Sequence, residues 1–417
     1  MTEDTLPDSA AGIFHGWWIV AVAFLAQFLA LGCSVAVYGL FIPVLTGEFG
    51  ASFMTANLGL SILGATMALS GAVVGPMLDR HSIRAIMVGG ATINAAAFAL
   101  MSFATELWQL GLLFGVCIAV GGAMFGPLAA NTVVAKWFER HRGRAVGIAS
   151  MGAPTGGLLL SPIAGFMIGD YGWRETLMVF AALHVALLPL LWSTIRNQPQ
   201  DLDLAPDGEA PAPALGAASG RVWQTAEVLR SRNFWVLAMA FGAVGAIAGA
   251  FNANVIPYAG DLQIGLGEAS FFISAIGGTA ILGTLLFGML ADRVSIRALM
   301  WFSFGLQAIA FVFLRATVPG YGMLMASVLV FGLAAGAMMP VMAAAVGRGF
   351  GAISFGRVMG FIGPVTLPFA FIGPPLTGWI RQTSGSYLHA FDVFVVVFVI
   401  ASLILLFLKL PEVKDVA

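Results

Sequence analysis

Apolar residues along this chain occur in twelve long runs, separated by short clusters of turn-forming or charged residues. Each run approaches the length of about 20 mostly apolar residues that an α-helix needs to cross a bilayer. Their approximate limits are 16–43, 53–78, 85–104, 108–135, 145–168 and 173–195, and then 233–258, 269–291, 298–315, 321–347, 357–380 and 388–409. The pattern therefore predicts an all-α membrane protein with twelve transmembrane helices.

A polar segment separates the sixth run from the seventh. Its sequence, RNQPQDLDLAPDGEAPAPALGAASGR, is rich in Pro, Ala, Gly and Asp, which is typical of a flexible linker. We therefore expect an N-terminal six-helix bundle at 1–195, a linker at 196–232 and a C-terminal six-helix bundle at 233–417.

The composition supports a protein that lies in a lipid bilayer. Hydrophobic residues make up 59% of the chain and charged residues 9%, whereas charged residues are about 25% of a soluble domain. The few Lys and Arg residues are dispersed among the loops, so we expect no nucleic-acid partner. Cys33 and Cys117 lie in separate apolar runs and the five His lack ligand spacing, so we expect packing thiols, no metal and no cofactor.

The distribution of Lys and Arg predicts the orientation. With both termini in the cytoplasm, sixteen of the nineteen basic residues fall on the cytoplasmic side, and the exceptions are Arg174, Arg315 and Arg381. Cytoplasmic loops of membrane proteins carry an excess of Lys and Arg. We therefore expect a multi-pass protein of the cell (inner) membrane with cytoplasmic termini.

The two halves of the chain share a sequence register. DRHSIR occupies 79–84 and DRVSIR occupies 292–297, which gives an offset of 292 − 79 = 213. The same offset, without a gap, maps Pro127 onto Pro340, Gly143 onto Gly356, Arg144 onto Arg357, Gly147 onto Gly360, Pro162 onto Pro375 and Gly165 onto Gly378. Duplication of a six-helix unit is the economical explanation.

Each charged hexapeptide ends the second helix of its half and, with the preceding Gly75 or Gly288, resembles the signature of the major facilitator superfamily. Ser82 and Ser295 replace the usual second glycine of that signature. An aspartate at a helix end can sit against the N-terminus of a helix in the other half, where free N–H groups favour negative charge. We expect a latch that closes the cytoplasmic side, formed by Asp79, Arg80, Arg84 and Arg144 with Asp292, Arg293, Arg297 and Arg357. The alternative is that these charges only anchor loops.

Several stretches resemble the bacterial monocarboxylate-transporter branch of this superfamily, which includes the oxalate–formate antiporters. They are HGWWIV, EFGAS, KWFERHRGRAVGIASMGAPTGG and YGWRETL. The resemblance implies transport of small organic anions. That family often carries an arginine and an aspartate on helix eight and a lysine on helix one, but Thr284, Ala280 and Leu40 occupy these positions here.

Uncharged groups are therefore the candidates for substrate binding. A charge at the centre of a bilayer costs several kcal/mol and usually marks ion traffic, and this chain shows none there. His184, midway along helix six, could titrate but is expected to be a packing residue. Pro154 is expected to interrupt helix five and free backbone donors beside Thr155. The candidates are Gln27, Tyr38, Asn131, Thr155, Asn252, Asn254, Thr284 and Thr366.

The leading hypothesis is a secondary transporter of a small organic anion, with a monocarboxylate as the first choice, that works by rocking of two six-helix halves. The chain lacks the G-x-x-x-x-G-K-[ST] phosphate-binding loop, so gradients rather than ATP would drive it. The alternative is an exporter of neutral or amphipathic compounds. An enzyme is not expected, since no dyad or metal cluster is visible. We expect a monomer whose partners are the substrate and the bilayer.

Overall fold

The computed structural model describes residues 14–139, 141–208, 223–291, 293–316, 320–351 and 354–409, without the side chains of residues 79, 142, 208, 316 and 355–357. Within these residues, twelve helical segments are long and apolar enough to cross a membrane. The prediction of an all-α membrane protein with twelve spans is confirmed.

Three of the first six spans are built from shorter helical pieces. The first consists of α1 (His15–Leu31), the π-helical η1 (Gly32–Ala36) and α2 (Tyr38–Glu48). The fourth consists of α5 (Leu107–Leu112), the π-helical η2 (Leu113–Ile118), α6 (Ala119–Phe125) and α7 (Pro127–Trp137). The fifth consists of α8 (Arg142–Ser150) and α9 (Gly152–Asp170). The other three are α3 (Phe53–Arg80), α4 (Ile83–Met101) and α10 (Trp173–Thr194).

The last six spans contain fewer interruptions. They are α12 (Arg232–Asp261), α13 (Leu266–Ala291), α14 (Ile296–Ala316), the pair α15 (Tyr321–Ala335) and α16 (Met338–Phe350), α17 (Phe355–Ser384), and α18 (Leu388–Ile404) with η5 (Leu405–Phe407). The described part of the linker contains η3 (Pro199–Leu202), η4 (Pro206–Gly208) and α11 (Thr225–Arg230). Several helices extend past the predicted runs, because helical turns can continue outside the hydrocarbon layer.

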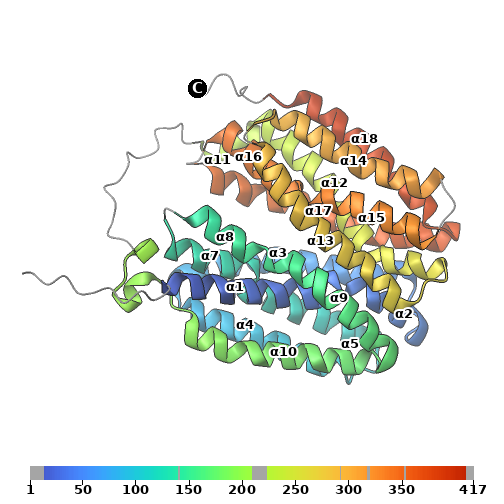
Figure 1. Cartoon of the computed structure of the whole chain (residues 1–417), viewed down its shortest axis with the longest axis horizontal. Helices are drawn as coiled ribbons and strands as arrows, with labels where there is room; N and C mark the ends of the chain where they lie inside the picture. Colours follow the sequence, from blue (N-terminus) through green and yellow to red (C-terminus); the bar gives the residue numbers. More distant parts are fainter. Residues whose placement is uncertain are drawn as a thin grey trace, which may run out of the picture.

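The two halves form two layers that lie against each other, with the blue-to-green half below the yellow-to-red half in Figure 1. The described chain ends, Phe14 and Lys409, and the described part of the linker lie at one face, which we call the terminal face. The opposite face, where α2, α9, α12 and α17 end, is called the far face. The contacts between the halves run along α9 with α13 and along α3 with α17.

Local contacts at the terminal face follow the 213-residue offset. Ser82 accepts a hydrogen bond from the Ala85 N–H at 3.3 Å, and Ser295 accepts one from the Ala298 N–H at 3.3 Å. A serine in this position satisfies a free donor at a helix start, which typically contributes about 1 kcal/mol relative to alanine. The departure from the glycine of the signature is therefore a helix cap in both halves.

A second pair of contacts repeats in the same way. The Lys136 ammonium donates to the Leu78 carbonyl at 3.2 Å, and the Arg348 guanidinium donates to the Ala291 carbonyl. Each cation lies at the end of the fourth helix of its half and binds the last turn of the second, where the helix dipole favours positive charge. These contacts fix the helix end that carries each charged hexapeptide.

Candidate functional site

The fourth, fifth and tenth spans are each interrupted partway along their length. The fourth span breaks at Gly126, before Pro127, and the tenth breaks between α15 and α16 at Gly336 and Ala337. The fifth span turns at Met151, three residues before Pro154. Interrupted helices free backbone groups at membrane depth, and transporters use such groups to bind substrates and ions.

A polar cluster lies beside the break in the fourth span. The Gln27 amide donates to Asn131 Oδ1 at 3.1 Å, and the Ser150 hydroxyl donates to the same oxygen at 3.2 Å. These residues come from α1, α7 and α8, so three spans meet at one amide. Gly126 packs against Ala30, one turn from Gln27, because a Cβ atom at Gly126 would lie 3.1 Å from the Ala30 Cβ. The cluster therefore lies next to the N-terminus of α7.

Hydrogen bonding orients the Asn131 side chain in this cluster. Both bonds end on Oδ1, which leaves the two hydrogens of Nδ2 as the donors that the Asn131 amide can offer to a ligand. The first N–H groups of α7 also lack partners within their helix, and a helix N-terminus attracts anions. The arrangement can bind a carboxylate through uncharged donors.

The remaining central candidates bond to helix backbones. The Thr155 hydroxyl donates to the Met151 carbonyl at 2.7 Å, and the Thr155 N–H bonds to the same carbonyl at 3.1 Å. The expected free donor at Thr155 is thus occupied, because α9 begins at Gly152, before the proline. Asn252 donates to the Ala248 carbonyl at 2.8 Å, Thr366 donates to the Gly363 carbonyl at 3.0 Å, and Thr284 donates to the Gly336 carbonyl at 3.0 Å. Thr284 therefore lies at the break of the tenth span.

Tyr38 and Asn254 lie away from this cluster, towards the far face. The Tyr38 hydroxyl donates to the Ala56 carbonyl and joins the first span to the second inside the N-terminal half. Asn254 exchanges two hydrogen bonds with Asn57, with amide-to-amide distances of 2.8 and 3.1 Å, and also accepts one from the Tyr387 hydroxyl at 3.2 Å. Asn57 and Asn254 are both buried and come from opposite halves. They join the halves at the far face.

Two close helix crossings also hold the far face shut. A Cβ atom at Gly378 would lie 2.5 Å from the Phe53 carbonyl oxygen, and one at Gly165 would lie 2.5 Å from the Ser270 Cβ. The offset maps Gly165 onto Gly378, and it also maps Asn57 onto Ser270. Each crossing brings a glycine of the fifth helix of one half against the start of the second helix of the other. Small residues of this kind allow close backbone approach in membranes.

The halves separate towards the terminal face. Cβ atoms placed at Gly75, Gly143, Gly147 and Gly360 would have no atom within 4 Å. These positions lie at the terminal-face ends of α3, α8 and α17, the same spans that cross closely at the far face. The close glycine contacts between these spans therefore lie at the far face and not at these terminal-face positions.

The described arginines of the expected latch contact their own half. Arg84 lies over the Trp192 ring at 5.5 Å, Arg297 donates to the Leu408 carbonyl, and Arg144 lies over the Trp17 ring at 5.7 Å. Arg80 and Arg293 are exposed. Asp292 and the side chains of Asp79 and Arg357 lie outside the described residues, so the aspartate contacts of the latch stay a prediction.

The three arginines outside the basic-rich side all form ion pairs. Arg174 pairs with Glu48 at 2.8 Å, Arg315 with Asp392 at 3.1 Å and Arg381 with Asp261 at 2.8 Å. All three pairs lie at the far face. Among the described Asp, Glu, Lys and Arg residues, Asp392 lies furthest from the ends of its span, and it is only the fifth residue of Leu388–Phe407. The middle of the membrane thus holds no charged side chain in the part that the structure describes.

Ser150, Asn57 and Tyr387 complete the polar contacts but were absent from the sequence-based candidates. Ser150 was inconspicuous because serine is common in membrane helices, where it usually bonds to its own backbone. For Asn57 the sequence offered only the 213-residue offset, which maps it onto Ser270, and this offset does not indicate which residue it faces. Tyr387 lies between two spans, where hydropathy gives no information. His184 Nδ1 donates to the Phe180 carbonyl at 2.8 Å, and the ring packs against Phe98 and Phe125.

Twelve spans in two related layers, with an uncharged polar cluster beside the interrupted fourth span, are what a membrane transporter of two repeated halves requires. The chain belongs to the Major Facilitator Superfamily, whose family model matches residues 22–255 and 240–417. This is a family of transporters and not of enzymes, and the chain is similar to its monocarboxylate transporters.

Relatives and solved structures agree with this family. Monocarboxylate transporter 12 of Rattus norvegicus is 24% identical over 95% of this chain and 86% of its own length, and monocarboxylate transporter 3 of Rattus norvegicus is 27% identical over 89% and 75%. The MFS-type transporter YcxA of Bacillus subtilis (strain 168) is 24% identical over 77% of each chain. A bacterial homolog to the human lysosomal transporter Spinster superimposes with a TM-score of 0.76 at 16% identity, covering 95% of this chain and 97% of that chain. This last likeness concerns the fold.

Proposed function

We propose that this protein is a secondary transporter of a small organic anion, with a monocarboxylate as the first candidate substrate. The observation that carries the proposal is the Gln27–Asn131–Ser150 cluster beside the N-terminus of α7. The cluster supplies oriented N–H donors but no charge. The names of the relatives, which are monocarboxylate transporters, support the same substrate class.

Recognition without a cation has a physical consequence for coupling. A carboxylate that binds to amide and backbone donors keeps its negative charge, because no arginine neutralises it. Bringing that charge to the middle of the membrane costs several kcal/mol unless the site is hydrated or the charge is exchanged. Exchange of one anion for another avoids net charge movement. We therefore favour antiport over uniport.

Alternating access would require the far face to open while the terminal face closes. The far face opens when the Gly165 and Gly378 crossings separate and the Asn57–Asn254 bonds break, and the terminal face closes through contacts such as the expected latch. With the terminal face in the cytoplasm, as the Lys and Arg distribution favours, the structure corresponds to an inward-open state in the cell (inner) membrane. A monomer contains all the parts of this mechanism.

Export of neutral or amphipathic compounds is the second candidate. It is favoured by the uncharged membrane centre and by the 19 Met and 33 Phe residues of the chain. Adaptable methionines and aromatic rings can contact apolar substrates of different shapes.

Counterflow in proteoliposomes tests both candidates. Vesicles are preloaded with monocarboxylates, dicarboxylates or neutral analogues of the same size, and uptake of the labelled compound is followed. We expect trans-stimulation by monocarboxylates, with at least a tenfold loss in Asn131→Asp, because a carboxylate at this position repels an anion. Gln382→Ala, an exposed amide at the far-face end of α17, is the matched control and should keep full activity. Exchange of neutral analogues alone, unaffected by Asn131→Asp, would overturn the organic-anion proposal.

A further inference from the structure

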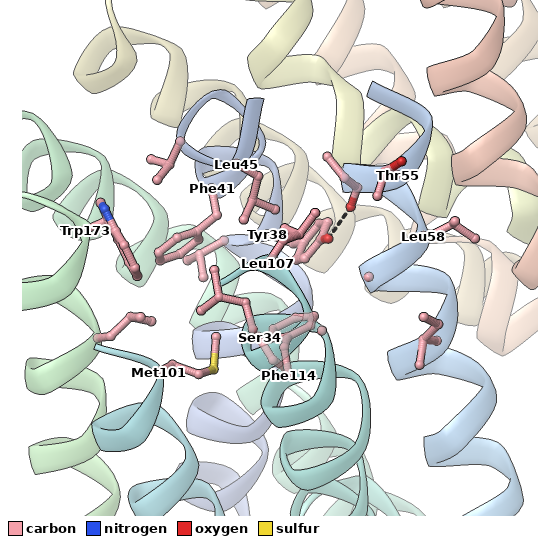
Figure 2. A pocket seen from close by; sticks show the side chains of 18 of the residues that line it. Ser34, Tyr38, Phe41, Leu45, Thr55, Leu58, Met101, Leu107, Phe114 and Trp173 are labelled. Atoms are coloured by element: carbon pink, nitrogen blue, oxygen red, sulfur yellow. Dashed lines mark hydrogen bonds between the residues drawn. The ribbon is translucent and has the colours of Figure 1, made fainter. Parts of the chain in front are cut away.

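A cavity of about 480 Å³ lies inside the N-terminal half, separate from the interface between the halves. It is surrounded by the first, second, third, fourth and sixth spans near the far face. Figure 2 shows Phe41, Leu45, Leu107 and Phe114 around it, with the Tyr38 hydroxyl bonded away from it to the second span. The volume is within the range of about 300 to 1,000 Å³ of small-molecule sites.

The wall of this cavity offers almost no hydrogen bonds. Ser34 donates to the Ala30 carbonyl, Tyr38 donates to the Ala56 carbonyl, and the Trp173 indole donates to Glu48 Oε2 at 2.6 Å. These three polar side chains of the cavity wall are thus already bonded to the protein. An occupant would contact mainly hydrocarbon and aromatic rings, so it must itself be apolar.

The cavity has a polar end and an opening towards the membrane. Leu58 and Ile62 of α3 and Leu107 and Gly111 of α5 line its side, and Trp108, next to them, is 66% exposed. Further from the far face, Ile62 closes this opening between α3 and the fourth span, because a Cβ atom at Gly115 would lie 2.6 Å from the Ile62 Cγ2. At the far-face end, the lining includes Glu106 and Thr55, both exposed.

We propose that this cavity binds one acyl chain of a membrane phospholipid whose headgroup carries an amine. Acyl chains are the apolar molecules that surround the spans, and an empty space of this size would forfeit dispersion contacts on all its walls. Glu106 at the polar end repels the carboxylate of a free fatty acid and attracts a headgroup ammonium. The occupant is therefore a phospholipid tail and not a fatty acid.

Two observations connect the acyl-chain cavity to the far-face closure. The π-helical segments η1 and η2 both line it, through Cys33 and Phe114, and such widened turns often mark functional sites. The piece of the first span that forms its upper wall, α2, also meets α12 in the other half, because a Cβ atom at Gly39 would lie 2.9 Å from the Ala253 carbonyl oxygen. A bound chain supports α2 against α12. It should stabilise the state that is closed at the far face.

Photolabelling of the full-length protein tests this site. The protein is reconstituted with phosphatidylethanolamine that carries a diazirine on one acyl chain, and labelled peptides are mapped by mass spectrometry. We expect labelling concentrated in residues 33–45 and 101–114. Gly111→Leu should reduce it at least fivefold, since the Cβ position of Gly111 is free of atoms within 4 Å and the new side chain fills the cavity. Gly169→Leu, which is equally free but does not line the cavity, should leave it unchanged.

A second probe and a charge variant distinguish a phospholipid from a fatty acid in the cavity, and a second glycine variant covers the case in which Gly111→Leu does not fold. A diazirine fatty acid should label the same peptides at least fivefold less, and Glu106→Gln should reduce that difference. Gly111→Met, with a more flexible side chain, replaces Gly111→Leu if the latter expresses poorly. Labelling spread evenly over all membrane-facing helices and unaffected by either Gly111 variant would overturn the proposal, as would preferential labelling by the fatty acid. None of these readouts depends on the transported substrate.

Discussion

The two helix crossings at the far face have the same origin but differ in what holds them. At one, Gly165 of α9 lies against Leu266 and Ser270 of α13, and at the other, Gly378 of α17 lies against Phe53 and Asn57 of α3. The offset of 213 relates every one of these residues to its counterpart. We call them the α9–α13 crossing and the α17–α3 crossing.

The two crossings differ in the contacts that surround the shared glycine. In the α9–α13 crossing the Ser270 hydroxyl bonds to the Gly267 carbonyl of its own helix at 2.5 Å, so it adds nothing between the halves. Close packing continues deeper instead, since a Cβ atom at Gly277 would lie 2.8 Å from the Pro154 carbonyl oxygen. Beside the α17–α3 crossing, Asn57 of α3 instead bonds across the halves to Asn254 of α12, and Gly64, the counterpart of Gly277, has no atom within 4 Å of its Cβ position.

This difference suggests a division of roles. Packing along a whole helix resists separation but permits sliding, whereas hydrogen bonds at one end break together once the helices part. We therefore infer that the α9–α13 crossing acts as the pivot and that the α17–α3 crossing acts as the releasable gate of the far face. Each of the following changes tests one part of this comparison.

The largest effect is expected from adding a methyl group at either crossing. Gly165→Ala and Gly378→Ala each place a Cβ within 2.5 Å of atoms that cannot move away easily. Overpacking of this kind costs about 1 to 3 kcal/mol, which is about a fivefold to 150-fold shift away from the closed far face. Accessibility of cysteines introduced near the far face should rise, and transport should fall.

Gly169→Ala is the control for this change, because it lies one turn from Gly165 on α9 and its Cβ position is free. It should leave accessibility unchanged. Equal accessibility in Gly165→Ala, Gly378→Ala and the control would mean that the crossings do not hold the far face shut.

The next effect separates the gate from the pivot. Asn57→Ala removes both bonds to Asn254 and leaves that buried amide partly unpaired, at a cost of about 1 to 3 kcal/mol. Ser270→Ala, the change at the equivalent position, removes only a bond within its own helix. Far-face accessibility should therefore rise in Asn57→Ala and stay near the original level in Ser270→Ala.

A double-mutant cycle of Asn57→Ala with Asn254→Ala sharpens the test. The two changes should be less than additive, because each removes the same pair of bonds. Full additivity, or an equal response of Ser270→Ala, would remove the distinction between gate and pivot.

A smaller effect is expected midway along the two crossings. Gly277→Ala brings a Cβ to 2.8 Å from the Pro154 carbonyl and 3.1 Å from the Leu158 amide nitrogen, so we expect a shift of about 1 kcal/mol. Gly64→Ala meets no atom within 4 Å and should have no effect. Distances between spin labels on α9 and α13 measure the outcome, and an equal response to both substitutions would contradict a pivot at Gly277.

Much of this comparison was accessible from the sequence, and its limits have physical causes. The hydropathy runs and the 213-residue offset predicted the twelve spans and paired Gly165 with Gly378, because duplication preserves the spacing of close contacts. Asn254 was chosen as a substrate ligand because it is a polar residue on a cavity-lining helix. The sequence could not indicate that Asn57 lies opposite it, since that contact depends on which face of the transporter is closed.

The site itself was only partly predictable for a similar reason. Gln27 and Asn131 were chosen separately as isolated amides, and the structure bonds them directly to each other, with Ser150 donating to the same Asn131 oxygen. A hydrogen bond across three spans requires the exact rotation of each helix, which hydropathy does not fix. The apolar cavity behind Tyr38 had no sequence signal at all, because leucines around a cavity are indistinguishable from leucines in a filled core.

The smallest effect is expected from the ion pair above the gate. Arg381 pairs with Asp261 and lies over the rings of Phe53 and Tyr387, so it joins α17 to the start of α3 through a ring contact of 5.3 Å with Phe53. The partly exposed ion pair should contribute about 1 kcal/mol or less, and salt should weaken it. Arg381→Gln is therefore expected to raise far-face accessibility modestly at low ionic strength and hardly at all at high ionic strength.

Arg315→Gln provides the matched comparison for this pair. Arg315 and Asp392 are about half exposed and link the ninth span to the twelfth within one half, so their loss should not change far-face accessibility at any salt concentration. An effect of Arg381→Gln that persists at high salt would assign the contribution to ring packing on Phe53 rather than to charge, since screening acts on the ion pair and hardly on apolar contact. The gate would then depend on hydrogen bonds and packing alone, as the pivot depends on packing.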